Sequence, residues 1–295
     1  MSPGRSRRDF LRLAGTTLAA TVCTASHRPM PTPTHVSPAT TGTAMPVVFV
    51  SHGAPTLALD QRSGADFARL AAAMPKPSAV LVVSAHWLDA PPTIGTTVAR
   101  PLLYDFAGFP DDLNRVRYEA PPAAALADEL ARRLPTLRRD DTRPWDHGVW
   151  VPLVHMYPGH DVPVLQVSMP WRWTPAQMFA FGQELAPLRK DRVLVLASGG
   201  AVHNLRRLDW NGQGTPPMWA TDFEHWLRER AAGRDFDALV DFRQRAPALQ
   251  LAHPSDDHFV PMLVAAGAAH EAGAATFPIT GFEYGSLSRL AVRFG

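Results

Sequence analysis

The sequence predicts an α/β fold: a single domain with a central, mostly parallel or mixed β-sheet flanked by helices. Short runs of Val and Leu alternate with longer helical patterns from Met45 onward. These runs are continuously apolar, which is typical of strands buried on both faces, and their alternation with helices indicates βαβ units. A length of 295 residues, of which 46% are hydrophobic, suits one large domain of this class.

Residues 1–25 are predicted to be a twin-arginine signal peptide. They hold the pair Arg7 and Arg8, an aromatic-leucine step and a short, weakly apolar run that ends in small residues. The run is too short to span a membrane, so we expect no stable membrane span in the mature chain. The expected location is periplasmic, or outside the cytoplasm by the twin-arginine route. Cleavage after about Ala25 would also remove Cys23, the only cysteine.

The positive charge of the chain lies in this leader. The formal net charge is +2, but residues 1–25 carry four arginines and one aspartate, so residues 26–295 have a net charge of about −1. A nucleic-acid partner would require a basic surface on the folded part, and the sequence argues against one. Residues 26–45 are rich in Pro, Thr and Ser and are predicted to be a flexible linker. The catalytic domain is expected to span residues 46–295.

The individual elements follow from the local pattern. Continuous β-branched and leucine runs predict strands over 46–51, 78–84, 162–168, 192–197 and 275–280. Helical spacing of apolar residues predicts helices over 63–74, 121–134, 174–187 and 219–232. We find no internal repeat and no second composition regime, so one domain is the simplest interpretation.

Three histidines stand at or just after the ends of predicted strands: His52, His86 and His203. In open α/β sheets, ligands bind beyond the carboxyl ends of the strands, which places the expected active site at this edge. Gly53 follows His52, and Gly199 and Gly200 lie shortly before His203; the tight turns that glycine permits can direct a side chain into a crevice.

Two more histidines are candidates for chemistry. His147 follows Asp146 and precedes a predicted helix, and a neighbouring carboxylate would orient the ring for acid-base work near neutral pH. His258 is expected in the first turn of a helix capped by Ser255 or Asp256. We expect solvated or structural roles for the histidines outside such contexts, which are His155, His160, His225 and His270. His253 precedes a proline and is expected to be a turn residue.

Neutral imidazoles that gather at strand ends are typical ligands of zinc or ferrous iron. The residues themselves therefore predict a mononuclear metal site at the carboxyl edge of the sheet, without specifying a reaction. A serine hydrolase is disfavoured because no GxSxG motif is present, and glycine-rich phosphate loops are also missing.

Seven motifs in a fixed order resemble those of a known family. They are SHGAP at 51–55, SAHW at 84–87, DFAGFP at 105–110, DHGVWVPL at 146–153, SGGAVHNLR at 198–206, HPSDDHFVPM at 253–262 and EYGSLS at 283–288. Together they resemble the class III, LigB-like extradiol ring-cleavage dioxygenases, in the 4,5-DOPA extradiol dioxygenase branch. The resemblance covers nearly all of residues 46–295.

The resemblance implies one divalent metal ion, Zn²⁺ or Fe²⁺, held by His52, His86 and His258. It implies that His203 is a fourth ligand or a base and that His147 is the acid-base histidine. Protocatechuate relatives have glutamate at the position of His258, a ligand set that suits ferrous iron. The all-histidine set here favours zinc in an isolated sample.

The implied reaction inserts both atoms of O₂ into a small aromatic diol, DOPA-like or another dihydroxyphenyl compound, and opens the ring next to the diol. Four aromatic residues are candidates for the walls of a planar pocket, although each is also a candidate for the core: Trp87, Phe106, Phe109 and Trp145. Two alternatives remain at this point: a zinc-dependent hydrolase of a small ester or amide, and a non-catalytic binder of a metal or phenol.

Overall fold

The computed structural model describes residues 44–210, 212 and 215–295. The predicted signal peptide and residues 26–43 of the predicted linker lie outside the described residues. Met45, expected as the last linker residue, is 1% exposed, and its backbone N–H donates to the carbonyl of Arg189 at 3.0 Å. Within the described residues, no helix is long and apolar enough to cross a membrane.

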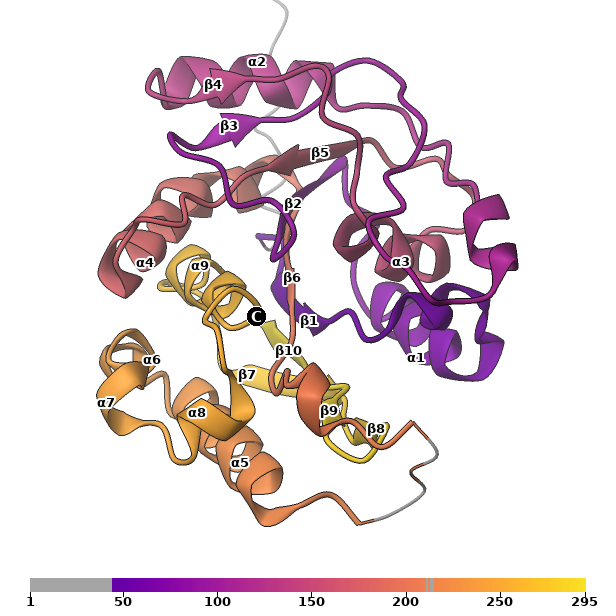
Figure 1. Ribbon diagram of the computed structural model, residues 1–295. Helices are drawn as coiled ribbons and strands as arrows, with labels where there is room; N and C mark the ends of the chain where they lie inside the picture. Colours follow the sequence, from indigo (N-terminus) through magenta and orange to yellow (C-terminus); the bar gives the residue numbers. More distant parts are fainter. Residues whose placement is uncertain (1–43, 211, 213–214) are drawn as a thin grey trace, which may run out of the picture. The chain divides into compact units, whose positions relative to one another are not determined.

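The described residues form the mixed sheet that the sequence predicts (Figure 1). Its strand order is β4-β3-β5-β2-β6-β1-β10-β7, and β5, β2, β6 and β1 run parallel to their neighbours within that group. A separate antiparallel pair joins β8 and β9. The strands are β1 (Val47–Ser51), β2 (Ala79–Ser84), β3 (Thr93–Ile94), β4 (Arg138–Arg139), β5 (Val164–Val167), β6 (Val193–Gly199), β7 (Ala275–Ile279), β8 (Phe282–Glu283), β9 (Leu287–Ser288) and β10 (Ala291–Phe294).

The three central strands end level with one another. Ser51 of β1 pairs with Gly199 of β6, and Ser84 of β2 pairs with Ser198 of β6. Every residue of these strands is buried, as their continuous apolar sequences predict for strands covered on both faces. The residues that follow β1, β2 and β6 therefore emerge together at one edge of the sheet.

Helices cover both faces of the sheet. In Figure 1, α1 and α3 lie on one side and α4 and α9 on the other. The expected helices are present at slightly shifted bounds, with shorter ones between them. They are α1 (Gln61–Ala72), α2 (Ala124–Arg133), α3 (His147–Met156), α4 (Pro175–Leu185), α5 (Met218–Ala232), α6 (Phe236–Val240), α7 (Phe242–Arg245), α8 (Leu249–Ala252) and α9 (Val260–Ala268); the 3-10 turns are η1 (Pro55–Leu59), η2 (Asp111–Arg115), η3 (Ala186–Asp191) and η4 (Leu205–Arg207).

Alternate residues of β1 enter two separate hydrophobic layers. Val47 and Phe49 pack with the buried residues of α4, α5 and α9, whereas Val48 and Val50 pack with those of α1 and α3. The period-two geometry of a strand produces this division, because successive side chains point to opposite faces. The continuous apolar runs are thus explained by two cores rather than one.

Two glycines allow α4 and α9 to approach closely. A methyl group at Gly267 of α9 would overlap the backbone carbonyl of Phe179, and one at Gly182 of α4 would overlap that of Val264. The obstructing atoms belong to the helix backbones, so relief would require the two helices to separate.

We therefore expect Gly267→Ala to lower the free energy of unfolding by about 1–3 kcal/mol, the usual cost of overpacking. The intrinsic helix preference for Ala over Gly acts in the opposite direction, so a measured loss of stability would underestimate the steric cost. Urea denaturation followed by circular dichroism measures the change. Gly273→Ala is the control, because its nearest neighbour would lie at 3.5 Å, an ordinary contact. Equal stability of the two variants would contradict the steric account.

Candidate metal centre

Five histidines from separate elements line one cavity of about 580 Å³. His52 follows β1, His86 follows β2, and His203 lies after the end of β6. His147 is the first residue of α3, and His258 precedes α9. The level ends of the central strands bring the first three together, as the sequence predicts, and the start of α3 and the turn before α9 supply the other two.

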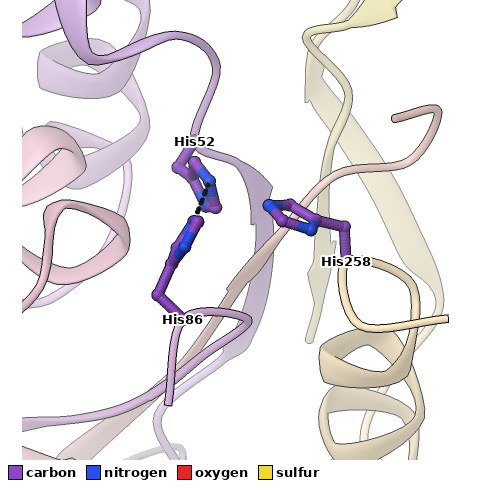
Figure 2. A group of neighbouring side chains, drawn as sticks. All are labelled: His52, His86 and His258. Atoms are coloured by element: carbon purple, nitrogen blue, oxygen red, sulfur yellow. Dashed lines mark hydrogen bonds between the residues drawn. The ribbon is translucent and has the colours of Figure 1, made fainter. Parts of the chain in front are cut away.

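His52, His86 and His258 direct ring nitrogens toward one another (Figure 2). One nitrogen from each ring lies within 4.8 Å of the other two, and the Nε2 atoms of His52 and His86 are 3.1 Å apart. The Nε2 atom of His258 is buried and has no hydrogen-bond partner among the described residues. A buried nitrogen without a partner is costly in a folded protein, unless a bound ion or water satisfies it.

Hydrogen bonds fix the tautomers of two of these rings. The hydroxyl of Ser198 donates to the carbonyl of Gly148, so its oxygen accepts from Nδ1 of His52 at 3.0 Å. Nδ1 of His258 donates to the carboxylate of Asp257 at 2.6 Å. With the proton held on Nδ1, the Nε2 lone pair of each ring is free for a metal ion.

Burial keeps these imidazoles neutral. Desolvation lowers the pKa of His52 well below its ordinary value, and the other histidines of the cluster lower it further. Desolvation is also the main cause that lowers the pKa of His86 to about 3 and that of His258 to about 4. Metal ions bind the neutral imidazole, so the three rings present the required form at neutral pH. The donor set, its spacing and the unpartnered nitrogen together fit a divalent cation.

His203 lies against the cluster in a different way. Its ring stacks on that of His258, with 3.5 Å between the ring centroids and an angle of 3° between the planes. Among the described residues, neither of its ring nitrogens belongs to the group formed by His52, His86 and His258. Desolvation, followed by the proximity of His258, lowers the pKa of His203 to about 3. His203 is thus a neutral ring on the cavity wall.

The carboxylate that holds His147 is Asp105, and our expectation of Asp146 was wrong. Nδ1 of His147 donates to Asp105 at 2.7 Å, and its backbone N–H donates to the same oxygen at 3.1 Å. Asp146 is fully buried and accepts hydrogen bonds from Ser84 and Gln166 instead. Burial of Asp105 opposes ionisation, but the bond from His147 outweighs it and lowers the pKa of Asp105 to about 2.

The helix at His258 begins later than expected. Neither Ser255 nor Asp256 caps it with its side chain; α9 starts at Val260, and Phe259 occupies the cap position. The backbone N–H of Val260 donates to the carbonyl of Asp256, which closes a turn that contains His258. The turn, and not a first helical turn, aims the ring at the cluster.

Two of the four aromatic residues that we expected to line the cavity do so. Phe106 and Phe109 line the cavity. Trp87 instead packs beneath the guanidinium of Arg143 at 5.4 Å, and Trp145 lines a different cavity. Sequence reasoning missed two rings that line this cavity, Trp210 and Tyr284. Tyr284 lies in the quoted EYGSLS motif, whereas nothing in the sequence around Trp210 distinguishes it from a loop residue.

Two histidines outside the cavity have the structural roles that we expected. Nε2 of His155 donates to the carbonyl of Leu57 at 2.8 Å, and Nε2 of His253 donates to that of Ala201 at 3.0 Å. Both side chains are buried. His253 also occupies the C-cap of α8, in agreement with the turn expected there.

Comparison with known proteins is consistent with this geometry. Residues 46–295 match a family described as the catalytic LigB subunit of aromatic ring-opening dioxygenase. A protein of Escherichia coli K12 named 4,5-DOPA dioxygenase extradiol is 34% identical over 260 residues, which is 86% of this chain and 96% of that protein. A Beta vulgaris protein of the same name is 34% identical over 261 residues, 83% of this chain and 95% of its own length.

A solved structure has the same fold. The crystal structure of an uncharacterized protein from Escherichia coli K12 superposes with a TM-score of 0.74 at 32% sequence identity. The match covers 85% of this chain and 100% of the other.

The burial of neutral histidines predicts a pH-dependent stability. Desolvation lowers the pKa of His253 from 6.5 to about 4, so between these values the unfolded chain holds a proton that the folded chain does not. The free energy of unfolding then falls as the pH drops through this window. In metal-free protein, His253→Leu should make this decline shallower by up to about 1.4 kcal/mol per pH unit. Urea midpoints from pH 7 to pH 4.5 provide the measurement, and parallel profiles would refute the assignment.

Proposed function

The chain belongs to the LigB family of aromatic ring-opening dioxygenases and is an extradiol ring-cleavage enzyme, and we propose that its substrate is a catechol, DOPA-like or another dihydroxyphenyl compound. The observation that supports this most is the convergence of three neutral imidazole nitrogens in a cavity that also contains His147 and Asp105. This arrangement supports a metal site with a separate proton-transfer group.

We propose that His52, His86 and His258 hold one divalent cation, either zinc or ferrous iron. Both metals accept imidazole ligands. The two carboxylates near the cluster, Asp105 and Asp257, are hydrogen-bonded to Nδ1 atoms of His147 and His258. When bound, the cation would lower the free-energy cost of removing protons from the catechol hydroxyls and would activate dioxygen.

The remaining residues would move and hold protons. Because Asp105 accepts the Nδ1 proton of His147, Nε2 is the nitrogen left to exchange a proton with substrate or oxygen. The neutral His203 can accept a proton or a hydrogen bond from a catechol hydroxyl, and its stack on His258 restrains the ring. We assign His203 the role of base because it lies outside the group of converging nitrogens.

Loss of two ligands should abolish metal binding. We expect the double variant His86→Ala, His258→Ala to lose its metal and its ring cleavage while it keeps its fold. Metal content by mass spectrometry and oxygen uptake with a catechol panel are the measurements. His225→Ala is the control, since that side chain is exposed and lies outside the cavity. Retention of metal and activity in the double variant would overturn the site.

A change at His147 should separate proton transfer from metal binding. We expect His147→Ala to lower kcat by about 10²–10⁴-fold, the usual contribution of a general acid or base, with metal content unchanged. Steady-state oxygen uptake and metal analysis of the same sample test this. If kcat stayed within a factor of two, His147 would not be the proton-transfer group.

We also propose that residues 1–25 direct export by the twin-arginine route, with residues 26–45 as a linker. The proposal rests on the arginine pair and the short apolar run of the leader. A reporter fused to residues 1–45 should leave the cytoplasm, and Arg7→Lys with Arg8→Lys should retain it there. Fractionation of cells measures both. Cytoplasmic retention of the unaltered fusion would remove the proposal.

A further inference from the structure

The cavity is much larger than a catechol ring requires. A cavity of about 150 Å³ is enough to hold a benzene ring, whereas this one measures about 580 Å³. The surplus volume leaves room for a substituent on the ring. We call the part of the cavity lined by Thr56, Leu205, Trp210 and Tyr284 the outer cavity. Its residues would contact such a substituent and so bear on which catechol fits.

One wall of the cavity is a continuous series of aromatic rings. Phe106 lies 5.8 Å from His147 and 5.7 Å from Phe109, as measured between ring centroids. Phe109 lies 6.3 Å from Trp210, which lies 4.9 Å from Tyr284. Trp210 is 56% exposed, so the wall extends from the proton-transfer histidine to the solvent.

Aliphatic side chains add to this apolar surface. Leu205, Leu208 and Leu287 also line the cavity, and Leu205 is 58% exposed. Leu205 and Trp210 are thus two large apolar side chains that remain exposed on the lining of one cavity. Exposed apolar surface that gathers at one place often marks a contact with a ligand.

Charged groups that could receive a charged substituent are missing from the wall. Among the described residues that line the cavity there is no lysine or arginine, and the one carboxylate, Asp105, is bonded to His147. Arg206 and Arg207 follow Leu205 in η4 but are exposed, and neither lines the cavity. The polar pair in the outer cavity is neutral: the hydroxyls of Thr56 and Tyr284 lie 3.2 Å apart, and one donates a hydrogen bond to the other.

We propose that this cavity selects catechols that carry an uncharged, apolar substituent and that it disfavours a free amino acid such as DOPA. The inference rests on the proposed function and narrows its substrate class. A carboxylate or ammonium placed against this wall would lose part of its hydration without gaining an ionic partner. An alkyl or aryl substituent would bury its apolar surface against the same side chains.

A matched substrate series tests the preference. 4-Propylcatechol and 3-(3,4-dihydroxyphenyl)propionate differ in the terminal group of the side chain, and L-DOPA adds an ammonium to the propionate. With protein loaded with Fe(II), we expect kcat/KM for 4-propylcatechol to exceed that for either acid by roughly tenfold or more. A value for L-DOPA or the propionate equal to or above that for 4-propylcatechol would overturn the proposal.

A pair of arginine variants tests whether the wall causes the preference. Leu205→Arg places a cation at the cavity lining on an exposed side chain, so the fold should tolerate it. We expect it to raise kcat/KM for the propionate and to reduce the preference for 4-propylcatechol by roughly tenfold. Met218→Arg is the matched control, because Met218 is 77% exposed and does not line the cavity. An unchanged preference in Leu205→Arg, or an equal change in both variants, would overturn the proposal.

Calorimetric titration under nitrogen separates this inference from the proposed function, because binding occurs there without turnover. If no catechol is cleaved in air but 4-propylcatechol binds more tightly than L-DOPA, the proposed function fails and the selectivity of the cavity is supported. If the catechols are cleaved but L-DOPA binds as tightly or more tightly, the selectivity fails alone. Failure of 4-propylcatechol to bind at all would also overturn the inference.

Discussion

The site depends on the register of three parallel strands. Because β1, β2 and β6 end level, the residues after them leave the sheet at one edge, and His52, His86 and His203 meet although they are far apart in sequence. A shift of one residue in any strand would reverse which core each side chain enters, since the side-chain period of a strand is two. The two hydrophobic layers that fix the register therefore also fix the histidines.

Burial and hydrogen bonding act together on the cluster. Desolvation disfavours the charged imidazolium and leaves the rings neutral, which is the form that binds a cation. Neutrality alone would leave the tautomer open, and it is the partners at Nδ1 that settle it. Ser198 comes from the end of β6 and Asp257 from the turn before α9, so the elements that position the rings also orient their lone pairs.

The sequence was most informative where a site residue lies directly at the end of a regular strand. Continuous Val and Leu runs predicted the central strands, and histidines at their ends predicted the cluster. It was least informative where contacts join distant segments. Asp105 lies 42 residues before His147, and local reasoning selected Asp146 because it is adjacent. The backbone at the start of α3 turns Asp146 toward Ser84 in the interior, which adjacency in sequence does not reveal.

In our proposals, the chemistry lies at the edge of the sheet and the substrate selectivity in the loops beyond it. The histidines lie after the ends of strands, at the start of α3 and in the turn before α9, and the strands and helices themselves are constrained by two packed cores. Leu205 and Trp210 belong to the segment between β6 and α5, where both side chains are exposed, whereas Ala201, Val202 and Asn204 of the same segment are buried. Under our proposal, substitution of either exposed side chain changes which catechol substituent the cavity accepts and leaves the histidines in place. Similarity to relatives over the whole domain therefore supports the type of reaction more strongly than it supports the identity of the substrate. The apolar wall of the outer cavity is the part of this molecule from which the substrate has to be inferred.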